Sequence, residues 1–151
     1  MPGLSLHSPV GDLTLFEENG AIVALEWGWG REQEPTPLLE RAKRQLEAYF
    51  DAGLSNFDLP LAPVGGSIQH RIWAALQAIP AGNTQSYGAI AERLKTSARA
   101  VGAACAANPV PIIIPCHRVL GKDGRLVAYS GEGGVETKRR LLRLEGALLD
   151  L

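Results

Sequence analysis

The chain has 151 residues, of which 46% are hydrophobic, and a formal net charge of -1. This length and apolar content suffice for a buried core, in one domain or in two small subdomains. No apolar run approaches the roughly 20 residues that span a bilayer, and the N-terminus lacks a signal-peptide pattern, so we expect a cytoplasmic protein without membrane contact. Two cysteines are too few for a disulfide framework, and the three histidines lack metal-ligand spacing. We therefore expect reduced thiols, no metal and no cofactor.

The net charge hides an asymmetry along the chain. Residues 1–63 carry 4 basic and 10 acidic side chains, whereas residues 64–151 carry 11 basic and 6 acidic ones. Such a division favours a C-terminal part that faces a polyanion. A chance division of surface charge would give the same numbers. The composition predicts one domain over 1–63 and a second over 64–151.

Residues 1–63 are predicted to form a scaffold domain. Apolar and polar positions alternate over 3–27, with turn signals at 9–12 and 18–20, which is typical of a short antiparallel meander. Thr36 precedes Pro37 as an N-cap precedes a first helical residue, and apolar residues at helical spacing continue to about residue 51. The segment 53–66, rich in Gly, Pro and Asn, is the predicted linker.

The next segment predicts three helices. One covers residues 68–79 and ends at the Pro80–Asn83 turn signal. Two short helices, 86–94 and 98–107, follow on either side of a tight turn in which Ser97 is the expected N-cap. This pair predicts a helix-turn-helix. An ordinary pair of core helices has the same pattern.

The second helix of that pair consists almost entirely of small residues. A helix that reads the major groove needs long polar side chains, which this one lacks. Its bare surface, including Ala100 and Gly102, instead suits close approach to the narrow minor groove. Burial against a neighbouring helix would explain the small residues equally well. Arg99 favours the first interpretation, because a lone guanidinium is costly to bury and suited to entering a duplex.

The segment Pro115–Val119 places a thiol, an imidazole and a guanidinium on consecutive residues. It follows an apolar run over 110–114, predicted to be extended, that begins just after Asn108 and Pro109. Side chains at successive extended positions point apart, so activation of Cys116 by His117 would need a water between them. Beyond the cysteine we expect two short strands, 117–120 and 125–128, around a turn, then a glycine-rich loop over 129–134 and a closing helix over 135–146.

Pro115–Val119 resembles the active-site signature of the O6-alkylguanine-DNA alkyltransferases, the methylated-DNA-protein-cysteine methyltransferase family. Further matches in the same order are Ser86–Gly88, Arg99–Gly102, Asn108–Pro111, Tyr129–Gly131 and Leu144–Gly146. The matches span residues 68–146, and the turn over 8–11 resembles the variable N-terminal domain. The resemblance implies an α/β (α+β) protein: a small N-terminal antiparallel sheet with one helix, then a mainly helical C-terminal domain with a helix-turn-helix and the Pro-Cys-His-Arg segment.

The resemblance also implies a reaction. The family transfers a methyl or other alkyl group from O6 of guanine, and from O4 of thymine, in duplex DNA to its own cysteine, here Cys116, once per molecule. By resemblance Glu145 orients His117, and His117 activates Cys116 through water. Tyr87 and Ser130 match the groups that stabilise the departing guanine.

The target nucleotide must rotate out of the stack to be reached. By resemblance Arg99 fills the space it leaves, Tyr87 helps to turn the phosphate, and Asn108 is the hinge between the helix and the active site. The remaining expected contacts to DNA or substrate are Ala100, Gly102, Pro111, Arg118, Val119, Tyr129 and Ser130. Pro111 and the 129–131 loop would line the alkyl pocket, and Cys105 would serve in packing. The implied partner is double-stranded DNA containing O6-alkylguanine, bound by a monomer.

Two departures from the family pattern concern the pocket. Ile68 occupies a position where an aromatic residue is expected, and the loop 130–135 is longer than the family's compact form. Three alternatives remain open at this point. They are a helix-turn-helix sensor that binds alkylated DNA without turnover, a thiol hydrolase, and a helix-turn-helix regulator.

Overall fold

The computed structural model describes residues 1–147 and divides the chain into two compact units, Met1–Val64 and Gly65–Leu151. The last four residues of the expected domain 64–151 lie outside the described residues. Each unit has its own buried core of apolar side chains.

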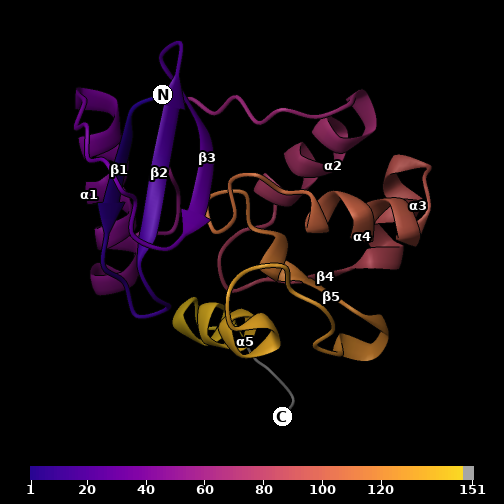
Figure 1. Ribbon diagram of the computed structural model, residues 1–151. Helices are drawn as coiled ribbons and strands as arrows, with labels where there is room; N and C mark the ends of the chain where they lie inside the picture. The colour runs from indigo at the N-terminus through magenta and orange to yellow at the C-terminus, as the bar shows by residue number, and fades with distance from the viewer. Residues whose placement is uncertain (148–151) are drawn as a thin grey trace. The chain divides into compact units, whose positions relative to one another are not determined.

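The first unit is built on a three-stranded antiparallel sheet in the order β1-β2-β3 (Figure 1), comprising β1 (Gly3–Leu6), β2 (Leu13–Glu18) and β3 (Ala21–Trp27). Asn19 and Gly20 form the two-residue turn between β2 and β3, and both have positive φ, at 52° and 79°. Asn-Gly favours this turn because both residues tolerate left-handed backbone. The predicted meander is confirmed.

Helix α1 (Pro37–Ala52) begins and ends as its sequence predicts. The Thr36 hydroxyl accepts a hydrogen bond from the Leu39 amide at 3.0 Å, and Gly53 ends the helix in a left-handed conformation with φ of 73°. The apolar face of α1 covers the sheet (Figure 1). The buried residues on that face are Leu39, Ala42, Leu46, Tyr49 and Phe50.

The predicted linker over 53–66 is wrong in part. The Ile22 amide donates to the Pro60 carbonyl at 2.8 Å, and the Ala62 amide donates to the Ile22 carbonyl at 2.9 Å. This parallel bridge between Ile22 and Leu61 covers part of the exposed edge of β3, which would otherwise leave its backbone groups unpaired. Residues 60–62 therefore belong to the structure of the first unit.

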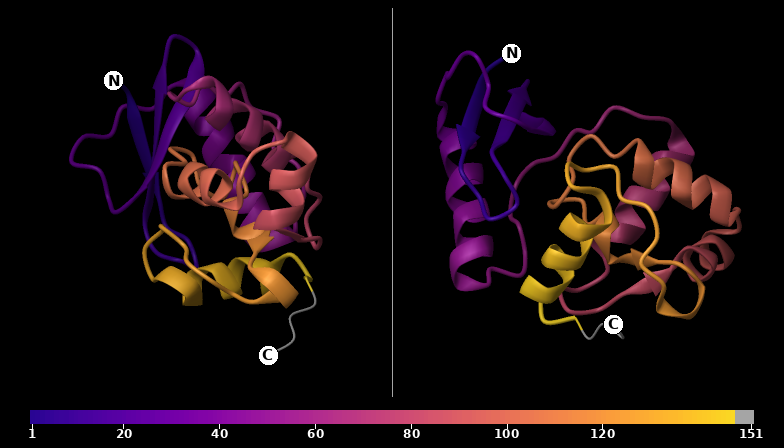
Figure 2. Two further views of the ribbon diagram at one scale, coloured as in Figure 1. Left: turned by 90° about the vertical axis from the view of Figure 1, so that its right-hand side faces the viewer. Right: turned by 60° about the horizontal axis from the view of Figure 1, so that its bottom comes forward.

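The second unit is mainly helical, as expected. Its elements are α2 (Ser67–Gln77), β4 (Gln85–Ser86), α3 (Tyr87–Leu94), α4 (Ala98–Ala106), β5 (Val119–Leu120) and α5 (Gly134–Leu144). Helices α3 and α4 lie side by side across a short turn (Figures 1 and 2). Ser86 and Ser97 cap them by accepting from the Ala89 and Ala100 amides, and Lys95 turns the chain with φ of 57°. The predicted pair of helices is confirmed.

The apolar run over 110–114 is a compact buried turn and not an extended segment. Ile112 has φ of 73°, and the Ile114 amide donates back to the Val110 carbonyl at 2.9 Å. Prolines at 109, 111 and 115 lack the amide donors that a strand would use. Cys116 follows in a 3-10 turn, Cys116–Arg118.

The hairpin predicted around Gly121 is also wrong. Strand β5 pairs in parallel with β4, and residues 125–128 form no strand. Between β5 and that segment lies a 3-10 turn, Lys122–Gly124, closed by a hydrogen bond from the Gly121 amide to the Arg125 carbonyl at 2.8 Å. The partner of β5 lies more than 30 residues earlier in the chain, so a reading of local turn signals does not find it.

Candidate active site

Asn108 holds the chain in position between α4 and Cys116. Its side-chain amide donates to the Ile114 carbonyl at 2.8 Å, and its side-chain oxygen accepts from the Val110 amide at 3.0 Å. Asn108 is itself buried, with 8% of its surface exposed. The buried turn and the 3-10 turn that carries Cys116 are thereby fixed to the end of α4.

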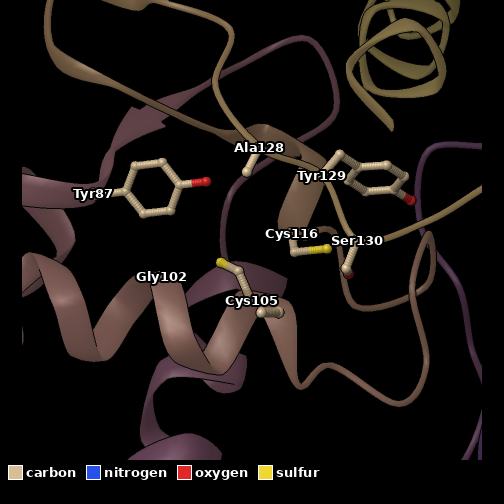
Figure 3. Close-up of a pocket in the computed structure, with 8 residues that line it drawn as sticks. Tyr87, Gly102, Cys105, Cys116, Ala128, Tyr129 and Ser130 are labelled. Carbon is tan, nitrogen blue, oxygen red and sulfur yellow. The ribbon is translucent and has the colours of Figure 1, made fainter. Parts of the chain in front are cut away.

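Cys116 opens onto a cavity of about 140 Å³. The residues that line the cavity are Tyr87, Gly102, Cys105, Ala106, Cys116, Ala128, Tyr129 and Ser130. Figure 3 shows Tyr87 reaching in from α3 with its hydroxyl pointing into the space, and Ser130 close to the Cys116 sulfur on the other side. The cavity thus joins the helix-turn-helix, the cysteine turn and the 128–130 segment.

His117 and Glu145 form a buried pair behind the cysteine. Their Nε2 and Oε2 atoms are 2.6 Å apart, and the side chains are 0% and 1% exposed. Burial lowers the pKa of His117, although hydrogen bonding to Glu145 and its charge oppose that shift. A neutral imidazole that donates through Nε2 leaves Nδ1 as the acceptor. Nδ1 has no hydrogen-bond partner among the described residues, so it is available to take a proton.

Arg118 does not face solvent, contrary to the expectation that it contacts DNA. Its guanidinium donates from Nε and Nη2 to the two Glu145 carboxylate oxygens, both at 2.9 Å, and from Nη1 to the Ile79 carbonyl at 2.6 Å. The residue is only 5% exposed. Such a forked pair fixes the carboxylate geometrically. Arg118 therefore positions Glu145, which in turn holds His117.

Burial raises the pKa values of several groups in the cavity, among them Cys116 and Tyr87. Burial raises the pKa of the Cys116 thiol, opposed by hydrogen bonding from Asn108 and by the charge of Lys138. Burial, together with the charges of Cys105 and Cys116, raises the pKa of Tyr87 to about 12. Tyr87 is thus a hydrogen-bond donor at neutral pH, and the thiolate of Cys116 needs help to form.

Only some of the residues predicted to contact DNA or substrate line the cavity. Tyr129, Ser130 and Gly102 line it, whereas Pro111 is buried and is not part of the lining. Val119 is also buried, and its amide donates to the Cys116 carbonyl.

Two further predicted residues lie outside the cavity, on α4. Arg99 is exposed and Ala100 is half-buried, so the helix presents its N-terminal turn to solvent. A Cβ added at Gly102 would meet no atom within 4 Å, so open space lies beside this glycine. The face of α4 expected to meet DNA is therefore accessible in this unit.

The sequence predicted no role in the site for Cys105 or Lys138. Cys105 was expected to serve only in packing, yet it lines the cavity with Cys116. Lys138 was not singled out, although it is fully buried on α5. A signal for Lys138 existed, because it precedes the buried Leu141 and Leu142 by three and four positions and so shares their helix face.

Within residues 1–147 no three His, Cys, Asp or Glu side chains gather as metal ligands would. No helix in the described part of the chain is long and apolar enough to cross a membrane.

Comparison with known proteins matches both units. Residues 67–147 match the family model of the 6-O-methylguanine DNA methyltransferase DNA binding domain, and residues 5–63 match the model of its ribonuclease-like domain. A methylated-DNA--protein-cysteine methyltransferase of Methanosarcina acetivorans is 39% identical, covering 93% of this chain and 96% of that protein. The counterpart of Mycobacterium tuberculosis is 42% identical, covering 93% and 90%.

Solved structures agree with these matches. The crystal structure of Mycobacterium tuberculosis OGT in complex with DNA is 41% identical, with a TM-score of 0.85, covering 97% of this chain and 93% of that one. An O6-methylguanine DNA methyltransferase from Methanococcus jannaschii has a TM-score of 0.69 at 25% identity, covering 98% and 96%. Matched over both of its units, the chain belongs to the 6-O-methylguanine DNA methyltransferase family and is a methylated-DNA--protein-cysteine methyltransferase.

Proposed function

We propose that Cys116 accepts a methyl or other alkyl group from O6 of guanine, and from O4 of thymine, in duplex DNA. The observation that carries this proposal is the placement of Cys116 on a cavity, next in sequence to an imidazole whose Nδ1 atom is unpartnered among the described residues. The sulfur attacks the alkyl carbon, the carbon–oxygen bond breaks, and a thioether remains on Cys116. Water does not readily displace a thioether, so each molecule acts once.

The proton of the thiol leaves through a water to Nδ1 of His117. Glu145 accepts from the opposite nitrogen of the ring and stabilises the imidazolium that results. Arg118 keeps the Glu145 carboxylate in place through its two parallel hydrogen bonds. This arrangement makes His117 the base and leaves Arg118 as a positioning residue.

The guanine that departs receives the electron pair of the broken bond and needs a donor. Tyr87 points its hydroxyl into the cavity (Figure 3) and stays protonated, because burial raises its pKa to about 12. Ser130 lines the opposite side of the cavity and supplies a second hydroxyl. These two groups stabilise the leaving base.

Duplex DNA binds along α3 and α4, with the target nucleotide rotated into the cavity. The exposed Arg99 enters the duplex where that nucleotide lay, and the small side chain of Ala100 and the bare Gly102 let the backbone of α4 approach closely. Asn108 is the hinge between α4 and the cysteine turn. Residues 64–151 thus carry the DNA-binding and transfer activity, residues 1–63 act as a scaffold, and the protein works as a cytoplasmic monomer.

A transfer assay tests the proposal. The intact protein is mixed with a duplex that carries radiolabelled O6-methylguanine, and label on protein is counted against the amount of protein. We expect label to reach one equivalent and to be lost in Cys116→Ala, while Cys105→Ala still takes up label. Catalytic release of label would instead indicate a hydrolase, and tight binding without transfer would indicate a sensor.

A further inference from the structure

Lys138 is a buried cation. The residue is fully buried, although lysine is among the residues least often buried without a partner. Its Nζ donates to the Ala128 carbonyl at 3.2 Å and lies 5.6 Å from the centroid of the Tyr87 ring. Ala128 and Tyr87 both line the cavity that holds Cys116. The ammonium group therefore lies just behind the cavity wall.

No carboxylate in the described chain neutralises Lys138. The Glu145 carboxylate is shared by His117 and Arg118, and Glu136 pairs with Arg139 on the surface. A buried charge without a counter-ion is costly, so the fold must gain from keeping it. The acidic groups that interact with the Lys138 charge are the thiols of Cys105 and Cys116.

Two other groups near Cys116 can carry a positive charge, but both bond to Glu145: Arg118 at all stages, and His117 once it has taken the thiol proton. Burial lowers the pKa of His117, which keeps its ring neutral before reaction. The charge of Arg118 is already matched by the two oxygens of Glu145. Among the described residues near the cavity, Lys138 is the cation whose charge is unmatched.

We propose that Lys138 is the counter-ion of the thiolate that forms at Cys116. The inference rests on the proposed transfer reaction, in which the thiol gives its proton to His117 through water and the sulfur then forms the new bond to carbon. The electron pair of the broken carbon–oxygen bond passes to guanine, so the negative charge moves from sulfur to the base beside Tyr87. Lys138 gives up no proton in these steps and is a positioning residue.

Its place against the Tyr87 ring suits both stages of the reaction. The ring face attracts the ammonium group, and the Tyr87 hydroxyl points into the space where guanine would lie. A single cation thus stabilises the charge first on sulfur and then on the leaving base.

The other groups that face Cys116 titrate outside the useful pH range or are kept neutral. Burial raises the pKa values of Tyr87 and Cys105, each to about 12, and burial raises that of Tyr129 further. His117 and Glu145 form one buried pair on the remaining side. Burial lowers the pKa of Lys138, opposed by the charges of Cys105 and Cys116. A pH profile between 7 and 10 therefore reports the coupled titration of Cys116 and Lys138.

The test measures thiol reactivity without DNA. The rate of Cys116 alkylation by iodoacetamide is followed from pH 6 to 10 in Cys105→Ala, with Lys138→Met, Lys138→Arg and the exposed Arg143→Met added one at a time. We expect Lys138→Met to raise the midpoint of the profile by about one pH unit or more and to slow alkylation at pH 7.5 about tenfold. Lys138→Arg should restore most of the rate, and Arg143→Met should change nothing.

Thermal unfolding shows whether Lys138→Met is folded. Replacement of an uncompensated buried charge by an apolar side chain of similar length should leave the melting temperature unchanged or raise it. An unshifted pH profile in folded Lys138→Met overturns the proposal, whatever its melting temperature. A failure of the wild-type protein to take methyl from DNA would instead overturn the proposed function, because the iodoacetamide profile does not depend on that reaction.

Discussion

The two units bury polar groups in opposite ways. In the first unit the Ser5 hydroxyl meets the Thr14 hydroxyl at 2.8 Å and accepts from the Gly30 amide at 2.9 Å and the Gln33 side chain at 2.8 Å, and Thr14 donates to the Gly28 carbonyl. The second unit also buries charged groups, among them Arg118 and the Glu145 side chain, and Nδ1 of His117 has no partner in the described chain.

The buried polar groups of the first unit serve the fold, whereas those around Glu145 in the second unit serve the reaction. The Ser5 network is neutral and complete, and it ties the loop after β3 to the sheet. The Glu145 network contains an atom that is ready to accept a proton, and the unmatched charge of Lys138 lies nearby. The Ser5 network stabilises the fold. The Glu145 network keeps a proton acceptor available for the reaction and makes the fold less stable than a fully paired network would.

The largest effect is expected from Arg118→Met. This change removes the two hydrogen bonds from the Arg118 guanidinium to the buried Glu145 carboxylate, which should lower the free energy of unfolding by about 3–5 kcal/mol and abolish methyl transfer. Urea unfolding monitored by circular dichroism measures the loss. Arg41→Met removes an exposed ion pair in the first unit and should cost about 1 kcal/mol or less. An equal loss of unfolding free energy in Arg118→Met and Arg41→Met would contradict the difference between the two units.

Ser5→Ala should cost less and leave the chemistry intact. The change removes the central hydroxyl of the network in the first unit and leaves the Gly30 amide and the Gln33 side chain short of an acceptor, for a loss of about 1–3 kcal/mol. The single-turnover rate at saturating DNA should stay within twofold of wild type. A rate that falls with stability would contradict the assignment of this network to structure alone.

Removal of one helix cap in each unit sharpens the comparison. Thr36→Ala and Ser97→Ala each delete a hydroxyl that caps a helix, and each should lower stability by about 1 kcal/mol. Because Ser97 begins α4, its loss should also weaken affinity for methylated duplex, whereas Thr36→Ala should not. Fluorescence anisotropy with a labelled duplex distinguishes the two variants, and equal affinities would contradict the proposed interface.

Acid should produce the smallest effect, through His117. The pKa of His117 is lower in the folded protein than its ordinary value of 6.5, so its stabilising contribution is present above pH 6.5 and is lost as the pH falls. The loss should stay below about 1 kcal/mol at pH 6. Transfer should slow over the same range, because a protonated ring accepts no proton.

The sequence predicted what depends on local signals. The Asn19-Gly20 turn, the Thr36 and Ser97 caps and the α3–α4 pair follow from residues close together in the chain, and all are present. The pairing of β5 with β4 and the bridge at Leu61 join distant segments, so no local pattern specifies them. The turn at Ile112 departs from an extended apolar run because three nearby prolines lack amide donors.

In the site, too, residues within local motifs were predicted, and contacts between distant residues were not. Motif resemblance pointed to Cys116, Tyr87 and Ser130, and the cavity contains all three. The expected contact of Arg118 with DNA was wrong, because Arg118 bonds to Glu145, which lies 27 residues further along the chain. The helix periodicity of α5 could have identified Lys138, since buried leucines share its face.

The shared carboxylate of Glu145 also constrains how this chain can evolve. Loss of Glu145 would remove the acceptor of Nε2 of His117 and of Nε and Nη2 of Arg118, and loss of Arg118 would leave a buried carboxylate short of a partner. Substitution of Glu145 or Arg118 alone should therefore reduce both stability and activity. In lineages related to this chain, the two residues should be exchanged together or retained together, even where the surrounding surface diverges freely.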